Sequence, residues 1–119
     1  MKKILIVIAV STFAFQSAHA EFKTGNGLLT VWREYSKANA GNSYNENDDG
    51  FYTGYVAGIC DANMHTLFNI PDGVTIGQAC DVVGKWLDMH PEELNKPARQ
   101  LVAEALKEAF PMHKLPLNK

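Results

Sequence analysis

The stretch from Gly50 to His90 constrains the fold of this chain more than any other part of its sequence. Two apolar-rich segments flank Pro71-Asp72-Gly73, a triplet typical of a tight turn because proline fixes φ and glycine accepts a left-handed backbone. Within each segment, apolar residues recur at spacings of three and four, the period of an α-helix. The stretch therefore predicts two helices joined by a turn, with the rest of the chain packed around them.

The first helix of this pair is expected over residues 50–67 and is apolar around most of its circumference, which is typical of a central, buried helix. The apolar positions are Phe51, Tyr52, Tyr55, Val56, Ile59, Cys60, Met64 and Leu67. The remaining stripe carries Gly54, Gly58, Asp61 and His65. The two glycines would let a neighbouring backbone approach closely, within the domain or across a homodimer. Asp61 and His65 lie one turn apart, and because no third group joins them we favour a structural hydrogen bond over an acid-base or metal pair.

The second helix is expected over residues 76–90. Thr75 and Gln78 have the spacing of a capping box, in which each side chain bonds the other residue's backbone amide. The segment is cleanly amphipathic. His90 precedes Pro91 and is expected to cap carbonyl groups of the last turn.

One cysteine lies on each helix of the pair, Cys60 and Cys80. In an antiparallel hairpin the two positions would be nearly level, given the rise of about 1.5 Å per residue. Paired cysteines of exported proteins are usually bridged. The sequence therefore predicts a Cys60–Cys80 disulfide rather than a thiol nucleophile.

Two further helices are expected, over residues 27–37 and 96–110. The first carries Trp32, which we expect in the core, and follows Thr24, a good helix cap. Asn95 is expected to cap the second, and Pro111 to end it. The prediction is an all-α fold, a small four-helix domain with a central buried helix and one disulfide.

Residues 38–49 are rich in Asn, Gly, Ser and Asp, which predicts an exposed loop. Three acidic residues, Glu46, Asp48 and Asp49, follow Tyr44 in it. The loop is either a solvated linker or a recognition loop. The spacing lacks the glycine and final glutamate of an EF-hand, which argues against calcium.

The N-terminus reads as a signal peptide of residues 1–20, with Lys2 and Lys3 before an apolar run and Ala18-His19-Ala20 as the cleavage pattern. We therefore expect a mature domain over residues 21–119, exported to the periplasm and not membrane-bound. Removing Lys2 and Lys3 from 11 basic residues leaves nine against 13 acidic ones, a balance that disfavours nucleic acid.

A search for catalytic patterns finds little. Ser36 and Ser43 are the serines of the mature chain, and neither lies in a nucleophile motif. No histidine occurs in a metal-ligand motif such as HExxH. The sequence therefore predicts a binding protein rather than an enzyme, with no cofactor and no metal.

Several short motifs occur in an order that resembles the Rap/Tai family of immunity proteins. They are Thr24-Gly25-Asn26, Gly54-Tyr55-Val56-Ala57-Gly58 with Asp61-Ala62, Pro71-Asp72-Gly73-Val74-Thr75 with Gln78, His90-Pro91-Glu92, and Ala105-Leu106 before Ala109-Phe110-Pro111. The resemblance implies an all-helical, periplasmic, often homodimeric protein. It further implies that the protein binds and occludes a peptidoglycan amidase toxin delivered by a type VI secretion system.

On that reading the partner-binding residues lie on exposed acidic tips. We expect Tyr44 as an aromatic anchor, with Glu46, Asp48 and Asp49 beside it, and Asp72 of the Pro-Gly turn as an equally exposed protrusion. The rival class is a small periplasmic helical chaperone or stress protein, which would protect clients at acid pH.

Overall fold

The computed structural model describes residues 23–113, so the expected signal peptide lies outside the described residues. Within this range the chain forms four α-helices and one short 3-10 helix, which confirms the all-α, four-helix prediction. They are α1 (Gly25–Asn39), α2 (Glu46–Asn63), α3 (Ile76–Met89), η1 (Pro91–Glu93) and α4 (Ala98–Ala109). No helix in this range combines the length and apolar character needed to cross a membrane.

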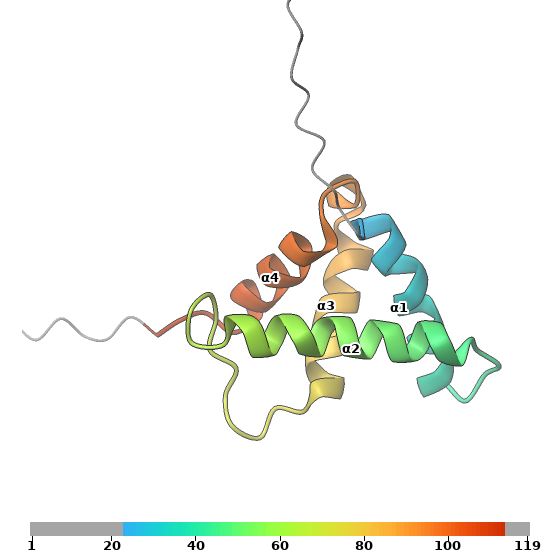
Figure 1. Ribbon diagram of the computed structural model, residues 1–119, viewed down its shortest axis with the longest axis horizontal. Coiled ribbons are helices and arrows are strands. Elements are labelled where there is room, and N and C mark those ends of the chain that lie inside the picture. The colour runs from blue at the N-terminus through green and yellow to red at the C-terminus, as the bar shows by residue number, and fades with distance from the viewer. Residues whose placement is uncertain (1–22, 114–119) are drawn as a thin grey trace, which may run out of the picture.

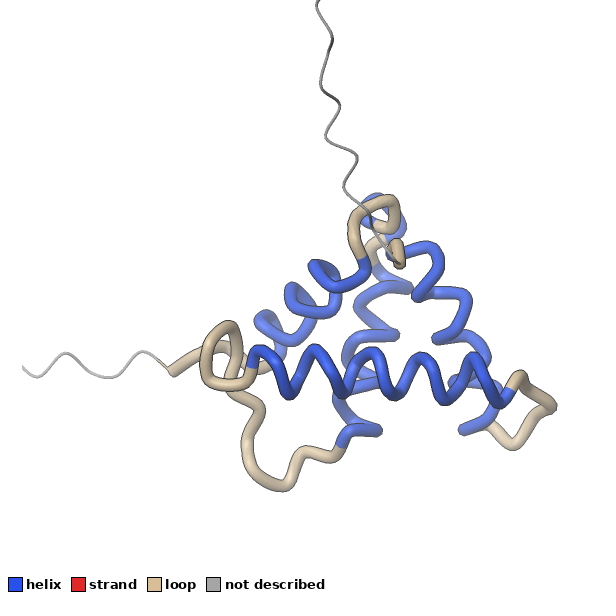
Figure 2. The backbone as a smooth tube through the Cα atoms, viewed as in Figure 1, coloured by secondary structure: helices blue, strands red, loops and turns tan. Residues whose placement is uncertain are grey.

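The helices form a triangular frame around α3 (Figure 1). α1 and α4 descend from a shared corner toward the two ends of α2, while α3 runs crosswise behind α2. Loops occupy the corners of this frame, as the tube in Figure 2 shows. The shared corner is held by backbone hydrogen bonds, because Gly25 donates to the carbonyl of Lys96 (2.9 Å) and Ala98 donates to that of Lys23 (2.9 Å).

The core contains side chains from every α-helix and is centred on three aromatic rings. Trp32 and Tyr35 of α1 stack at 5.6 Å between ring centroids, and Tyr52 of α2 lies 5.4 and 5.2 Å from them. The Tyr52 hydroxyl donates a buried hydrogen bond of 2.6 Å to the carbonyl oxygen of Cys80 on α3. Trp32 is therefore a core residue, as the sequence predicted.

The predicted central helix of the Gly50–His90 stretch, α2, packs against the other three α-helices but is not buried on every side. α2 buries one face, made by Tyr52, Val56 and Cys60, whereas Phe51 on another face is 44% exposed. α2 also begins and ends about one turn earlier than the predicted range of residues 50–67. A helix that is apolar nearly all round can bury any of its faces, and here the faces toward the other helices are covered while Phe51 stays exposed.

The close helix contact expected at Gly54 and Gly58 is not made within the domain. A Cβ atom added at either position would have no neighbour within 4 Å. Close approaches occur instead at Gly84 of α3, where an added Cβ would lie 2.2 Å from the Trp32 ring, and at Gly25 of α1, where it would lie 2.8 Å from the Leu94 backbone.

Because Gly54 and Gly58 face open space, Gly54→Ala and Gly58→Ala should each stabilise the domain. Glycine in a helix interior costs about 1 kcal/mol relative to alanine, and no contact here offsets that cost. We expect each variant to raise the melting temperature measured by circular dichroism. A lower melting temperature at high protein concentration, where a dimer would form, would show that these glycines make contacts the monomer does not have.

The predicted disulfide is absent, because Cys60 and Cys80 are both free, buried thiols. The prediction assumed that α2 and α3 form an antiparallel hairpin, but α3 crosses α2 instead of running beside it (Figure 1). Residues at equal distances from the connecting turn are therefore not placed opposite each other. Burial raises the pKa of the Cys80 thiol to about 12, and the neighbouring Cys60 adds to this effect. Burial also raises the pKa of Cys60.

The buried thiols predict a loss of stability at alkaline pH. Below the ordinary thiol pKa of 9.0, Cys80 is protonated in both states, so its contribution is fully present. Above that value only the unfolded chain loses the proton, so the free energy of unfolding should fall between pH 9 and 12. The slope is at most about 1.4 kcal/mol per pH unit for each such group. Urea unfolding in reductant should show a shallower slope for Cys80→Ala, and an unchanged slope would contradict the assignment.

Helix caps explain where the elements begin. Thr75 and Gln78 form the predicted capping box, with bonds of 3.2 and 2.7 Å to each other's backbone amides. Thr24 caps α1 by accepting from the amide of Gly27 (3.3 Å). Asn95 does not cap α4, which begins after Pro97 without a side-chain cap.

Candidate partner-binding site

The loop between α1 and α2, residues 40–45, protrudes at one corner of the frame (Figure 1). α1 closes with hydrogen bonds from the amides of Ala40, Gly41 and Asn42 to carbonyl groups of the last turn, at 2.9–3.1 Å. Gly41 has a φ of 75°, a left-handed conformation that glycine adopts without strain. The loop therefore leaves α1 in a defined direction.

The far end of the loop is fixed by Asn45, which caps α2. Its side-chain oxygen accepts from the amides of Asn47 (3.0 Å) and Asp48 (3.1 Å). Glu46, Asp48 and Asp49 consequently belong to the first turn of α2 and not to the loop, which corrects the sequence-based boundary. Acidic residues at this position stabilise the positive end of the helix dipole.

Glu34 of α1 connects the two ends of the loop. One carboxylate oxygen accepts from the Lys37 ammonium (2.6 Å), and the other accepts from the backbone amide of Asn45 (2.8 Å). These bonds hold the pKa of the Glu34 carboxyl below its usual value. Because the carboxylate ties α1 to the start of α2, the loop is clamped at both ends.

Tyr44 lies next to this clamp and is 40% exposed. Glu46 is exposed, whereas Asp48 and Asp49 are half-buried. The structure thus brings together the predicted aromatic anchor and its acidic neighbours on one preorganised tip. Fixing a recognition loop before binding lowers the entropy lost when a partner is bound.

Asp72 does not belong to this tip. It lies in an exposed turn where Val74 donates to the carbonyl of Pro71 (3.2 Å) and Gly73 has a φ of 88°. That segment leaves α2 at its other end (Figure 1), and α2 is about 27 Å long at the helical rise per residue. The two predicted tips are therefore separate surfaces.

Asp61 and His65 do not form the pair expected from a continuous helix. α2 ends at Asn63, and His65 adopts a left-handed φ of 63° in the turn that follows. Its amide donates to the carbonyl of Phe68 (2.9 Å). Both side chains are exposed, and within residues 23–113 no cluster of three metal-binding residues occurs.

Sequence reasoning missed a surface on α3 and α4. The rings of Trp86 and His90 stack at 3.9 Å, and Trp86 donates from its indole nitrogen to Glu108 (2.9 Å). His90 Nδ1 lies 2.7 Å from the carbonyl oxygen of Trp86, which confirms its predicted capping role and places a hydrogen on that nitrogen. Beside them Met89 is 74% exposed. This stacked pair could have been predicted from the sequence, because Trp86 and His90 lie one helical turn apart.

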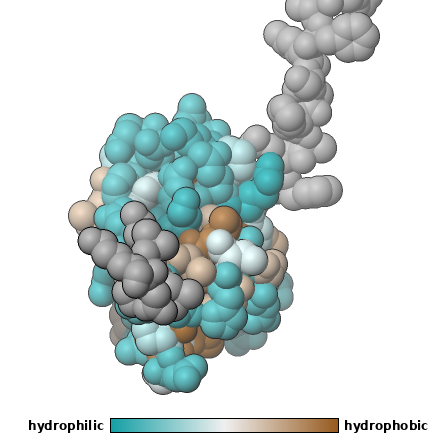
Figure 3. Space-filling model, turned by 90° about the vertical axis from the view of Figure 1, so that its left-hand side faces the viewer, coloured by the Kyte–Doolittle hydropathy of each residue, from teal (hydrophilic) through white to brown (hydrophobic). Residues whose placement is uncertain are grey.

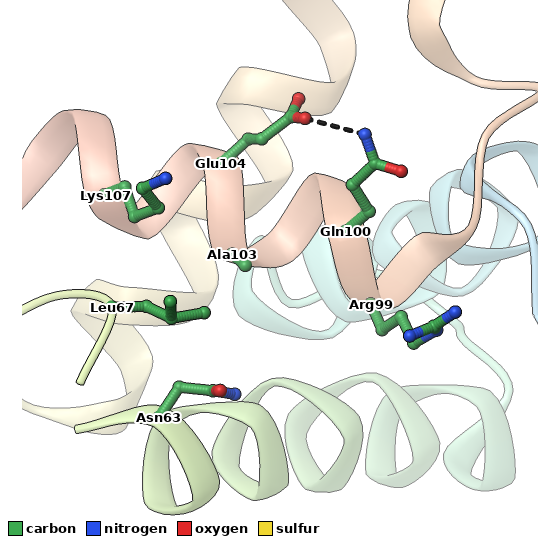
Figure 4. A pocket seen from close by; sticks show the side chains of 7 residues that line it. All are labelled: Asn63, Leu67, Arg99, Gln100, Ala103, Glu104 and Lys107. Carbon is green, nitrogen blue, oxygen red and sulfur yellow. Dashed lines mark hydrogen bonds between the residues drawn. The ribbon is translucent and has the colours of Figure 1, made fainter.

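A second missed feature is a cleft of about 410 Å³ between α4 and the end of α2. Its lining includes two basic residues of α4, Arg99 and Lys107, which sequence analysis did not single out. They flank Ala103 at spacings of four, which places all three on one helix face. Figure 4 shows this arrangement, with Leu67 facing the middle of the cleft from the opposite side.

The geometry thus describes a small helical protein with a fixed protruding loop and clefts on other faces. A family model described as Rap1a immunity proteins matches residues 24–112, so the chain belongs to the Rap1a immunity protein family. This match confirms the resemblance inferred from the sequence. A search of curated proteins returned no match.

Proposed function

We propose that this chain is a periplasmic immunity protein that binds a peptidoglycan amidase toxin delivered by a type VI secretion system. Membership of the Rap1a immunity protein family supports a toxin effector as the partner. The protein acts by occluding the toxin's cleft and performs no chemistry of its own. The observation that carries the proposal is the clamped loop of residues 40–45 with Tyr44 exposed on it.

The shape and charge of this tip suit insertion into an active-site cleft. Tyr44 offers a large, rigid side chain of the kind enriched in binding hot spots. The tip carries Glu34, Glu46, Asp48 and Asp49, and of these Glu34 is paired with Lys37. An acidic tip is attracted to a cleft that carries basic groups and repelled by an acidic one, which gives specificity as well as faster association.

The deciding experiment pairs this protein with an amidase-like toxin encoded next to its gene. The two proteins should co-elute in size-exclusion chromatography, and the immunity protein should inhibit cleavage of peptidoglycan crosslinks by the toxin. If it binds no such amidase but suppresses aggregation of client proteins at acid pH, the chaperone alternative replaces the proposal. Export is tested separately. We expect the mature periplasmic protein to begin at Glu21.

A homodimer is part of the same proposal, since the sequence resemblance implies one. The exposed face of α2 at Gly54 and Gly58 has room for a second helix, because no atom lies within 4 Å of the added Cβ positions. Analytical ultracentrifugation measures the mass in solution. Gly54→Leu should dissociate a dimer formed through this face, and a monomeric native protein would exclude it.

A further inference from the structure

The cleft between α4 and the end of α2 is shaped by the order of side chains on α4. Arg99, Ala103 and Lys107 lie along one face, so a small residue separates two long basic ones. Eight residues of helix separate the backbone positions of Arg99 and Lys107 by about 12 Å along the axis. Figure 4 shows Arg99 and Lys107 at opposite ends of the cleft, with Ala103 between them.

The opposite wall comes from Asn63 and Leu67, and an anchored turn holds it in place. Leu67 donates its amide to the carbonyl of Asn63 (3.0 Å), and the turn contains the left-handed His65. Phe68 is fully buried next to it, which fixes the turn to the core. Leu67 is therefore held outward, 41% exposed, and cannot collapse into the domain.

The two cations of the cleft are available to a ligand. Between residues 23 and 113 the ion pairs are Lys37 with Glu34 and Lys96 with Glu93, and neither involves Arg99 or Lys107. The acidic residue in the lining, Glu104, accepts a hydrogen bond from the Gln100 amide (2.9 Å; Figure 4). The lining thus carries two cations and one carboxylate, and neither cation forms an ion pair within the described residues.

The cleft has an apolar centre and a polar rim. Leu67 and Ala103 provide apolar surface at its centre, and the charged and amide groups surround them. The space-filling view of the end of the molecule shows hydrophobic patches enclosed by hydrophilic residues (Figure 3). Because the two charged side chains lie at opposite ends of the cleft, as drawn in Figure 4, a small anion would contact one of them at a time.

We propose that this cleft is a second docking site, which binds an acidic segment of a partner protein. The segment carries two carboxylates that flank an apolar side chain. The carboxylates pair with Arg99 and Lys107, and the apolar side chain rests on Leu67 and Ala103. Arginine suits this role because its planar group can hold a carboxylate through two hydrogen bonds. The site is separate from the loop of residues 40–45 and does not depend on the toxin's identity.

A blocked peptide of sequence Asp-Ala-Leu-Ala-Asp tests this inference. In an extended strand the backbone positions of its two aspartates lie about 13 Å apart, close to the spacing of about 12 Å between the backbone positions of Arg99 and Lys107. Titration into the full-length, ¹⁵N-labelled protein should shift amide signals of residues 63–67 and 99–107. Binding should weaken with added salt, because the contacts are between partly exposed charges. The matching Asn-Ala-Leu-Ala-Asn peptide should not produce these shifts.

The double variant Arg99→Glu with Lys107→Glu should weaken peptide binding at least about tenfold, since both favourable charge contacts become repulsive. Both side chains are exposed, so the fold should be retained, as the spectrum of the variant will show. Arg33→Glu is the control for reversing a charge outside the cleft, because Arg33 is an exposed cation of α1, and this variant should bind as the native protein does. Absence of shifts, shifts elsewhere, or equal binding by the neutral peptide or the double variant would overturn the proposal.

Discussion

Gly84→Ala is expected to destabilise the domain by about 2 kcal/mol, because the added methyl group overpacks the core. The new Cβ would lie 2.2–2.3 Å from three carbon atoms of the Trp32 ring, far inside van der Waals contact. Relief of such overpacking costs up to about 3 kcal/mol, and the better helix propensity of alanine returns about 1 kcal/mol. For a domain of this size the melting temperature should fall by roughly 8–16 °C.

Trp32 cannot move away without losing other interactions. Its indole nitrogen donates to a carboxylate oxygen of Asp88 (2.9 Å), and its ring packs against Tyr35 and Tyr52. A double-mutant cycle with Trp32→Phe checks the mechanism, because the smaller ring leaves space for the new methyl group. Gly84→Ala should cost less in the Trp32→Phe background. An equal cost in both backgrounds would mean that the clash is relieved elsewhere.

The contrast between Gly84 and Gly54 shows what sequence periodicity can and cannot predict. The pattern located both glycines on helices, but it could not tell which helix face meets a neighbour. α2 carries apolar residues on nearly every side, so burial of Tyr52 and exposure of Phe51 depend on how α1 and α3 cross it. Tertiary arrangement, which leaves no local signal, decides which glycine is packed.

Local signals predicted local structure well. The capping box of Thr75 and Gln78 fixed the start of α3, because both partners lie within one turn. The start of α2 was harder to predict, since Asn42, Asn45 and Asn47 are all good turn residues. Only Asn45 caps α2. Glu34 of α1 helps to select this residue as the cap, because its carboxylate accepts a hydrogen bond from the Asn45 backbone amide.

The candidate sites also differ in whether local sequence or tertiary arrangement determines them. The aromatic-acidic tip could be predicted because Tyr44 and its acidic neighbours are close in sequence. The cleft at Arg99 and Lys107 could not, because its other wall comes from the end of α2. The disulfide prediction was wrong for a related reason. It required α2 and α3 to form an antiparallel hairpin, whereas the two helices cross.

Tyr44→Ala is expected to weaken binding of the toxin by about 2 kcal/mol, or roughly 30-fold. The side chain is 40% exposed on a loop held by Asn45 and Glu34, so its removal should leave the stability of the domain nearly unchanged. Isothermal titration calorimetry with the toxin measures the affinity. Met89→Ala is the control, because it also removes an exposed apolar side chain but from the far end of α3.

A third variant separates direct contact from preorganisation of the loop. Glu34→Ala removes the carboxylate that accepts from the Asn45 amide, while Tyr44 stays in place. Affinity should fall by less than in Tyr44→Ala, and mostly through a less favourable binding entropy, because the freed loop must be ordered on binding. If Tyr44→Ala and Met89→Ala bind the toxin equally well, the tip is not the binding surface. Toxin recognition would then be sought at the separate Asp72 turn.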